Sequence, residues 1–393
     1  MNQKNIKYIS IGVGCGLLIA IGGLIAWKFI LPVLTNTNSV SVKKESKPEL
    51  FRIVEDNKLG YINEKGEVVI QPQFDFSVSI MYTSTDDYIS NLYERNGYNL
   101  YDNNGFAEGL LPVRLGERTG YVDRQGNYII NPQFDGGKSF SEGLAAVRVG
   151  DKWGYINPKG EYAIDPQFDY ADSFSEGLAR VNVGNKFGYI DKEGKFVINP
   201  QFDLPQTDNA PSFNFSEGLA IVFTDDGYGY IDREGNYVIE PQFSYADSFS
   251  EGLAVVELGG KWGYIDEEGN YVINPQFDYA DSFSEELAVV GVGDRAGYIN
   301  KQGEYIINPQ FERAGRFYEG IAVIRVGDKW GYIDKEGEFI INPQFDNAGG
   351  FLGEIAPVGI AAIQEQSGLI FKYGYIDKQG KYVYSNGEFS FEY

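Results

Sequence analysis

Hydrophobic positions in this chain form short, strand-length runs that recur at a fixed spacing. Between residues 50 and 393, β-branched and aromatic runs alternate with glycine-rich polar turns, the pattern of β-strands joined by tight connections. Each unit contains a Gly-Tyr pair followed by Ile or Val and then Asp or Asn, and five of the eight intervals between these pairs are 34 residues. The nine pairs begin at Gly60, Gly120, Gly154, Gly188, Gly229, Gly263, Gly297, Gly331 and Gly374. Such a period is typical of a tandem-repeat fold.

A single unit predicts three strands. Residues 144–149 form the first strand, and Gly150-Asp151 is typical of a two-residue type I′ or II′ hairpin turn. Residues 153–156 form the second strand, and after an Asx-type turn residues 162–164 form the third. Pro166 has no N–H to donate, so regular pairing should end there or run at an edge. Each unit is therefore predicted to be a three-stranded meander followed by an irregular returning arm.

The meander is apolar on both faces, with Trp153 and Tyr155 on one side and Ile156 on the other. A sheet of this kind must be covered on both faces, and the neighbouring units can cover it. The sequence therefore predicts an all-β array of about nine three-stranded meander units. An open, solenoid-like array is the first expectation, because 34 residues fit three strands more readily than the four of a typical propeller blade. A closed β-propeller is the alternative.

Three insertions interrupt the period of the array at 50–393. They lie near residues 75–105, 203–212 and 355–370. Insertions in repeats often lie on the binding face, although tolerated drift in loop length explains them equally well. The first insertion contains Tyr82, Tyr98 and Tyr101, which are candidate ligand-binding residues because aromatic side chains are enriched at interfaces.

The N-terminus predicts a membrane anchor. Residues 9–27 contain no charge and would span about 28 Å as a helix, close to the hydrocarbon thickness of a bilayer. We therefore expect a transmembrane helix at 9–34. Lys4 and Lys7 precede it, so the positive-inside rule places residues 1–8 in the cytoplasm and the array outside. Residues 35–49 are polar and predict a flexible linker.

The predicted span also contains a series of small residues. Gly12, Gly16 and Ala20 are spaced four apart, which would allow two such helices to approach closely and self-associate. The simpler interpretation is that these are ordinary small residues of a membrane helix. Cys15 is the single cysteine, so the chain has no intrachain disulfide.

Composition excludes several classes of function. The net charge is −23 and no Lys/Arg cluster occurs, which argues against nucleic-acid binding. The chain has no histidine, so Ser-His catalysis and the commonest zinc ligand are excluded. We predict no catalytic residue, no cofactor site and no metal site. The turns at 102–105 and 225–227 are interpreted as Asx turns, because they lack the remaining spacing of a calcium loop.

Carboxylate chemistry is the remaining route to an enzyme. A glycoside hydrolase needs two distinct acids beside one bond. Here the acids repeat at equivalent positions of successive units, which favours a structural, ladder-like role over a unique catalytic pair. They are Glu142, Glu176, Glu217 and Glu251. The chain is therefore predicted not to be an enzyme.

The repeated phrases resemble a known family. Lys-Trp-Gly-Tyr-Ile-Asp at 261–266 and 329–334, together with Ile-Asn-Pro-Gln-Phe and Phe-Ser-Glu-Gly-Leu-Ala, is similar to the bacterial WG-repeat family over about residues 50–393. The resemblance implies a repeat protein and supplies no catalytic residue to transfer.

These observations predict a non-enzymatic binding or scaffolding protein. We expect it at the cell membrane, spanning once, with the repeat array on the extracytoplasmic side of the cell envelope and an unknown protein or cell-wall ligand as its partner. The alternatives are a protein that binds a cell-wall glycan or peptide and, less favoured, a carboxylate-based glycoside hydrolase.

Overall fold

The computed structural model describes residues 49–55, 58–75, 106–203, 211–365 and 368–390. The chain divides into Met1–Lys47 and Pro48–Tyr393, and every described residue belongs to the second unit. None of these residues forms a helix that is long and apolar enough to cross a membrane. The predicted span at 9–34, including Gly12, Gly16 and Ala20, lies outside the described residues.

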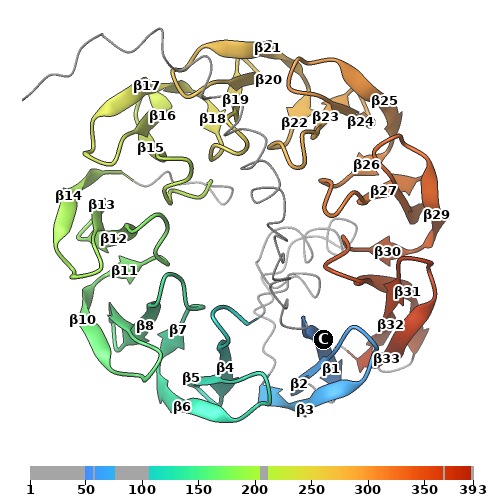
Figure 1. Cartoon of the computed structure of the whole chain (residues 1–393), viewed down its shortest axis with the longest axis horizontal. Helices are drawn as coiled ribbons and strands as arrows, with labels where there is room; N and C mark the ends of the chain where they lie inside the picture. The colour runs from blue at the N-terminus through green and yellow to red at the C-terminus, as the bar shows by residue number, and fades with distance from the viewer. Residues whose placement is uncertain (1–48, 56–57, 76–105, 204–210, 366–367, 391–393) are drawn as a thin grey trace, which may run out of the picture. The chain divides into compact units, whose positions relative to one another are not determined.

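The second unit is built from nine antiparallel sheets arranged in a ring, seen face-on in Figure 1. Blade 1 contains β1 (Phe51–Glu55), β2 (Lys58–Ile62) and β3 (Val68–Asp75). Blade 2 contains β4 (Leu111–Leu115), β5 (Arg118–Val122) and β6 (Tyr128–Phe134). Blade 3 contains β7 (Gly136–Gly137), β8 (Ala145–Val149), β9 (Lys152–Ile156) and β10 (Tyr162–Phe168). Blades 4 and 5 are β11 (Tyr170–Ala171), β12 (Ala179–Val183), β13 (Lys186–Ile190) and β14 (Phe196–Phe202); and β15 (Ala220–Thr224), β16 (Gly227–Ile231) and β17 (Tyr237–Phe243).

The remaining four blades have four strands each. Blades 6 and 7 are β18 (Tyr245–Ala246), β19 (Ala254–Leu258), β20 (Lys261–Ile265) and β21 (Tyr271–Phe277); and β22 (Tyr279–Ala280), β23 (Ala288–Val292), β24 (Arg295–Ile299) and β25 (Tyr305–Phe311). Blades 8 and 9 are β26 (Arg313–Ala314), β27 (Ala322–Val326), β28 (Lys329–Ile333) and β29 (Phe339–Phe345); and β30 (Asn347–Ala348), β31 (Ile355–Glu365), β32 (Gly368–Asp377) and β33 (Tyr382–Ser390).

The predicted all-β repeat is confirmed, and the preference for an open array was wrong. The sheets form a nine-bladed β-propeller, the alternative expectation. In the six four-stranded blades, the returning arm of the preceding unit supplies a two-residue strand, such as β11, that pairs as the innermost strand. A two-residue strand has no readable periodicity, which is why the sequence pattern predicted three strands instead of four.

The fixed glycine of the Gly-Tyr pair permits a close approach between strands. A Cβ on Gly154 would lie 2.5 Å from the carbonyl oxygen of Ile164 and 2.6 Å from the nitrogen of Pro166. The third strand continues through Pro166, but its register with β9 shifts on the way from Ile164 to Phe168. The proline therefore makes the pairing irregular without ending the strand, and only glycine fits opposite this bulge.

The tyrosine of each pair links one blade to the next. Tyr155 is fully buried, and its hydroxyl donates a hydrogen bond to the carbonyl oxygen of Asp172, at 2.7 Å, in blade 4. The Tyr155 ring also packs against Phe174 with centroids 4.9 Å apart. Equivalent hydroxyl-to-carbonyl bonds are made by Tyr121, Tyr189, Tyr230, Tyr264, Tyr298 and Tyr332. Neighbouring blades therefore cover both faces of each sheet, as expected.

The ring closes between blades 9 and 1. The Tyr375 hydroxyl donates to the carbonyl oxygen of Arg52, 323 residues away in the sequence, at 2.6 Å. This acceptor lies in β1, at the position of Arg180, whereas the other tyrosine hydroxyls bond the returning arm. The Val54 N–H donates to the Tyr373 hydroxyl at 2.8 Å, and the Tyr384 hydroxyl bonds the Glu55 carboxylate at 3.0 Å. The insertion at 355–370 lies in the paired strands β31 and β32, where it extends the hairpin of the last blade.

The repeated glutamates form a ladder between blades, as the sequence analysis interpreted them. Glu142 has a φ of 53° and precedes Gly143 in a tight Ser-Glu-Gly-Leu turn. Its carboxylate accepts a hydrogen bond from the N–H of Gly177, in the next unit, at 2.9 Å. Left-handed φ costs a non-glycine residue about 1 kcal/mol, and the contact to the next unit offsets this strain. Glu108, Glu176, Glu217, Glu251 and Glu285 bond the next unit in the same way.

Candidate functional site at the inner rim

The inner rim of the ring includes positions whose charge differs between equivalent units. In blade 6, cross-strand pairing places Tyr245, Glu257 and Trp262 in one row from the innermost strand outward. In blade 3 the same row contains Gly136, Arg148 and Trp153. The two rows are 109 residues apart in the sequence at every position. They belong to two homologous groups of side chains, which we define next.

We call the first group the basic cluster. It lies on blades 3 and 4 and contains Gly136, Lys138, Arg148, Trp153, Tyr170, Asp172 and Arg180. We call the second group the acidic cluster. It lies on blades 6, 7 and 8 and contains Tyr245, Asp247, Glu257, Trp262, Tyr279, Asp281, Ser282 and Arg316. Val289 stands in the acidic cluster's copy at the position of Arg180.

In the basic cluster two cations share one carboxylate. The Lys138 ammonium lies 2.6 Å from Asp172 Oδ1, and Arg180 lies 2.6 Å from Asp172 Oδ2. The Tyr170 hydroxyl also donates to Asp172, at 3.0 Å. Burial raises the pKa of the Asp172 carboxyl, but Arg180 and Lys138 offset this effect and hold it below its usual range. Asp172 is therefore a carboxylate at neutral pH.

The same two cations lie over aromatic rings. Lys138 Nζ lies 4.3 Å from the ring centre of Tyr170 and 5.7 Å from that of Trp153. The Arg180 guanidinium lies 5.1 Å to 5.5 Å from the rings of Tyr170, Phe187 and Phe213. Cation–π contacts of this kind stabilise a partly buried cation by about 0.5–2 kcal/mol each. The chain itself thus fills the basic cluster with a lysine and an arginine.

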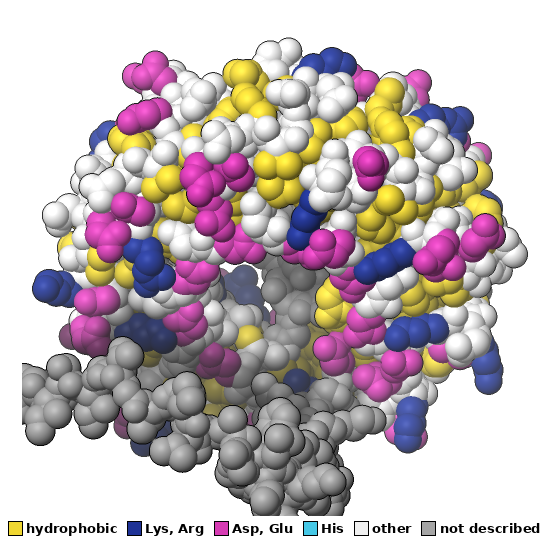
Figure 2. Space-filling view, turned by 45° about the horizontal axis from the view of Figure 1, so that its top comes forward, with side chains coloured by type: hydrophobic (Ala, Val, Ile, Leu, Met, Phe, Trp, Pro, Cys, Tyr) yellow, Lys and Arg dark blue, Asp and Glu magenta, His cyan; other side chains and the backbone are white. Residues whose placement is uncertain are grey.

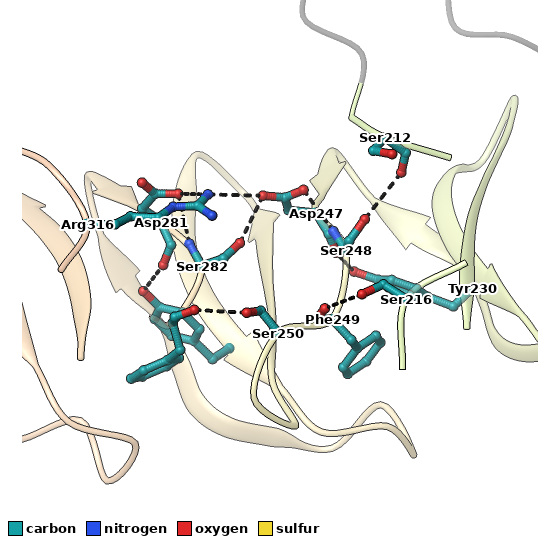
Figure 3. Close-up of polar contacts among 12 residues, drawn as sticks. Ser212, Ser216, Tyr230, Asp247, Ser248, Phe249, Ser250, Asp281, Ser282 and Arg316 are labelled. Atoms are coloured by element: carbon teal, nitrogen blue, oxygen red, sulfur yellow. Dashed lines mark hydrogen bonds and ion pairs between the residues drawn. The ribbon is translucent and has the colours of Figure 1, made fainter. Parts of the chain in front are cut away.

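In the acidic cluster (Figure 3) the two aspartates follow the innermost strands β18 and β22. Arg316, from blade 8, forms an ion pair with Asp281 and lies 3.8 Å from Asp247 Oδ2. The Ser282 hydroxyl donates to the same Asp247 oxygen at 2.9 Å, so one side-chain network joins both carboxylates. Burial lowers the pKa of Arg316, but Asp281 and Asp247 more than reverse the effect, so that its pKa is raised.

An aromatic row accompanies the acidic cluster. Ring centroids are 5.9 Å apart for Tyr228 and Tyr245, 5.1 Å for Tyr245 and Trp262, and 6.0 Å for Trp262 and Tyr279. Burial, followed by the charge of Asp247, raises the pKa of Tyr245 to about 12, so its hydroxyl stays protonated at neutral pH. Tyr279, with 48% of its surface exposed, is the most open ring of the row. The row therefore presents aromatic surface beside carboxylates.

The acidic cluster holds no group of side chains suited to a metal. Within the described ranges no set of three or more His, Cys, Asp or Glu residues is arranged to hold a metal ion. The carboxylates here bond the Ser248 and Ser282 amides, the Ser282 hydroxyl and Arg316. The arrangement is suited to binding a cationic or polar group.

The outer wall carries a different feature. The third strand of a blade exposes its first two residues, as at Tyr271 and Val272, which are 38% and 45% exposed. Figure 2 shows hydrophobic side chains on the visible surface between scattered acidic and basic ones. The Tyr271 ring packs edge-on against Phe243 of the preceding blade, with centroids 6.5 Å apart. The aromatic member of each outer pair is thus part of the contact between blades.

The candidate residues named from the sequence are not among the residues that the structure describes. Tyr82, Tyr98 and Tyr101 and nearly all of the 75–105 insertion are outside the described residues. Sequence reasoning missed both inner-rim clusters because it treated variation between repeats only as evidence against function. One signal was available, since Lys138 and Asp247 stand at the same position of the unit with opposite charge.

Comparisons with known proteins agree with the repeat. The sequence profile of the family described as "WG containing repeat" matches more than half of the chain. The matched segments are residues 60–80, 120–153, 153–187, 187–227, 228–262, 262–295, 297–330 and 330–360. No curated protein matches the chain.

Comparison with solved structures finds similar chains at low sequence identity. One described as a eukaryotic initiation factor is 10% identical with a TM-score of 0.54, covering 87% of this chain and 96% of that chain. Dihydro-heme d1 dehydrogenase NirN in complex with DHE is 13% identical with a TM-score of 0.41, covering 72% and 74%. Apo AztD from Citrobacter koseri is 11% identical with a TM-score of 0.37, covering 75% and 93%. The first of these structures, at 10% identity, shares the fold alone with this chain.

Proposed function

This chain belongs to the WG containing repeat family, and we propose that its ring is a non-enzymatic binding and scaffolding body. The observation that supports the proposal is that fixed and variable positions of the repeat make different contacts. Residues fixed in all units, such as Gly154 and Tyr155, are used in contacts within and between blades. Positions that vary, such as Lys138 and Asp247, gather at the inner rim. A rigid frame that displays variable side chains is suited to recognition.

The cell envelope is the place we propose for this function. The uncharged run at 9–27 and the lysines that precede it support a single membrane span with the ring on the extracytoplasmic side. The full chain is then expected to stay in the membrane fraction after alkaline carbonate washing, with the ring open to external protease. A soluble chain beginning near residue 35 would contradict this placement.

A cell-wall glycan is a second candidate partner. Half-buried aromatic rings beside carboxylates, as at Tyr245 and Trp262, resemble the stacking surfaces that proteins use for planar and ring-shaped ligands. A glycan array probed with the full chain in detergent tests this partner. Binding without turnover of labelled wall material supports a binding protein, and turnover lost in a carboxylate variant would establish an enzyme.

A further inference from the structure

We propose that the acidic cluster binds a primary ammonium group of an external cationic partner, at the place that Lys138 occupies in the basic cluster. The inference rests on the binding function proposed above and names the chemistry of the partner. The repeat allows two copies of the same group of side chains, 109 residues apart, to be compared within one chain. One copy is filled by the chain's own lysine and the other carries an aspartate there.

We call the place that the Lys138 ammonium occupies, and its counterpart in the acidic cluster, the ammonium seat. The basic cluster shows which groups surround an ammonium at this seat. Its ammonium, on Lys138, lies 2.6 Å from a carboxylate oxygen of Asp172 and 2.8 Å from the Tyr170 hydroxyl. The rings of Tyr170 and Trp153 lie 4.3 Å and 5.7 Å from the same nitrogen. A carboxylate, a hydroxyl and two aromatic rings are the groups that recognise an alkylammonium in proteins.

The walls of this seat are kept in the acidic cluster. Trp262 and Tyr279 have ring centroids 6.0 Å apart at 55°, against 5.8 Å and 60° for Trp153 and Tyr170. Asp281 stands at the position of Asp172. A further ring is added, since Tyr245 replaces Gly136 and lies 5.1 Å from Trp262.

The charge at the seat is reversed. The basic cluster contains three cations, Lys138, Arg148 and Arg180, and one carboxylate. The acidic cluster contains three carboxylates, on Asp247, Glu257 and Asp281, and one cation, Arg316. The formal charge therefore changes from plus two to minus two, so the seat favours a cation and disfavours an anion.

The acidic cluster is also more open to solvent. The Lys138 and Arg180 side chains, which fill the basic cluster, are 26% and 11% exposed. Arg316 is 47% exposed and Tyr279 is 48% exposed. Arg316 pairs with Asp281, the counterpart of Asp172, but it is more exposed than the two cations of the basic cluster. A cationic group arriving from solution can therefore reach the acidic cluster, where it shares these carboxylates with Arg316.

The occupant we assign is a lysine side chain on an extended, lysine-rich protein segment. A flexible four-carbon stem carries the ammonium of lysine, as it does for Lys138 at the homologous seat. The net charge of −23 raises the encounter rate with a basic segment and repels polyanions. An uncharged glycan would gain nothing from the reversed charge, so it becomes an outcome of the test.

The test measures binding of a fluorescein-labelled peptide in which lysines alternate with glycines, titrated with the full chain in detergent. We expect saturable binding that weakens as salt is added, because exposed charges are screened. Replacing lysine in the peptide by acetyl-lysine should abolish the binding. Asp247→Lys, which restores the residue found at 138, should weaken the peptide at least about tenfold.

The matched control is Glu267→Lys. It makes the same charge change in the same blade, but in the exposed turn between β20 and β21, where Lys192 and Lys301 stand in other units. We expect less than about a twofold change in peptide affinity, the size of a remote screened charge. Melting curves establish that both variants fold.

Three outcomes would overturn the inference. They are no binding of the lysine peptide by the wild-type chain, equal weakening by Asp247→Lys and Glu267→Lys, and equal binding of the acetyl-lysine peptide. A chain that fails this test but captures a wall glycan would keep its proposed binding function and lose the ammonium seat. Capture of neither ligand class would count against both.

Discussion

The backbone and the contacts between blades are the same around the basic and the acidic cluster, but the net charges of the two clusters are opposite. Beside the basic cluster, Lys152 pairs with Asp169 at 2.5 Å, and Gly184 N–H donates to the same carboxylate at 2.7 Å. Beside the acidic cluster, the corresponding ion pair, between Lys261 and Asp278, and the amide contact have the same two lengths. The tyrosine links of the two regions, at 2.7 Å and 2.8 Å, also agree.

This comparison teaches how a tandem repeat separates its two tasks. Contacts between blades recur in every unit because each blade must be covered by its neighbour. Residues at the inner rim are not needed for that purpose, so they can change charge without changing the frame. Functional residues in such a ring are therefore expected where equivalent positions differ. Matched substitutions at the shared contacts should change stability equally beside both clusters.

The largest expected effect comes from Gly154→Val and Gly263→Val. At both positions an added Cβ would lie 2.5 Å from the carbonyl oxygen of the facing isoleucine, on a backbone that cannot move aside without losing the bulge. We expect each variant to lose more than about 4 kcal/mol of stability or to fail to fold. Chemical denaturation followed by circular dichroism measures the change. A wild-type midpoint for either variant would contradict the account of the close approach.

A conservative change next to these glycines provides the control. Trp262→Phe should cost about 1 kcal/mol or less, because Phe187 already stands at the equivalent position of blade 4. If Trp262→Phe destabilised the ring as much as Gly263→Val, the position before Gly-Tyr would have a structural role that its variability does not indicate.

The next largest effect separates the two clusters. Asp172→Asn leaves Lys138 and Arg180 without their shared carboxylate, at a place where the Arg180 side chain is 11% exposed. Breaking a buried ion pair costs about 3–5 kcal/mol, and partial exposure reduces this to about 2–3. Asp281→Asn should cost about 1 kcal/mol or less, because Arg316 is 47% exposed.

Urea denaturation of both variants measures this difference. The opposite order, with Asp281→Asn the more destabilising, would show that the acidic cluster is a structural element and would weaken the case for an external ligand. Asp172→Glu keeps the carboxylate and should recover part of the loss, which separates lost charge from lost packing.

The sequence predicted the strands of the meander and the need for stacked units, because alternation and turn chemistry are local. The hairpin at Gly150 was predicted correctly, since the positive φ at that glycine suits a two-residue turn. The innermost strand was not predicted, and closure of the ring was only the alternative expectation. Two residues such as Tyr170-Ala171 carry no period, and the closing contacts of Tyr375 with Arg52 join residues 323 apart.

The candidate site depended even more on the fold. Lys138, Asp172 and Arg180 are separated in the sequence, and only blade stacking brings their charges together. The opposite charges of Lys138 and Asp247 are visible in the sequence, but their meaning requires knowing that both lie at the inner rim. The candidates Tyr82, Tyr98 and Tyr101 remain predictions, outside the described residues.

A smaller, equal effect is expected from Tyr155→Phe and Tyr264→Phe. Each removes a buried hydroxyl that donates to the carbonyl oxygen of the next unit's aspartate. The unpartnered carbonyl costs about 1–2 kcal/mol. The two variants should agree within about 0.5 kcal/mol if the frame is shared, and the measurement is again the free energy of unfolding in urea. Unequal losses of stability would show that the charge of the nearby cluster changes the strength of the tyrosine hydrogen bond.

The smallest effect concerns pH and the exposed ion pairs at the hairpin turns. The hydrogen bond from Lys152 holds the pKa of Asp169 below its usual value, and Lys261 does the same for Asp278, each with help from a glycine N–H. The folded-state pKa is the lower one, so the unfolded chain binds more protons as pH falls. This stabilisation is therefore present above about pH 4 and is lost as pH falls through the lowered pKa.

Asp278→Ser tests this contribution with a residue that the chain already uses, because Ser244 stands at the equivalent place before blade 6. The variant should melt slightly below the wild type at pH 7. The gap should shrink as pH falls below about 4 and close once the pH is below the lowered folded-state pKa, where Asp278 is protonated in both states. Asp169→Ser should show the same gap and the same closure, since both carboxylates have the same partners at the same distances. Thermal melts at stepped pH measure the two curves. A difference in melting temperature that persisted in acid would mean that packing of the aspartate stabilises the turn. A difference at one site alone would mean that the reversed charge of the inner rim changes the stability of the hairpin turn beside it.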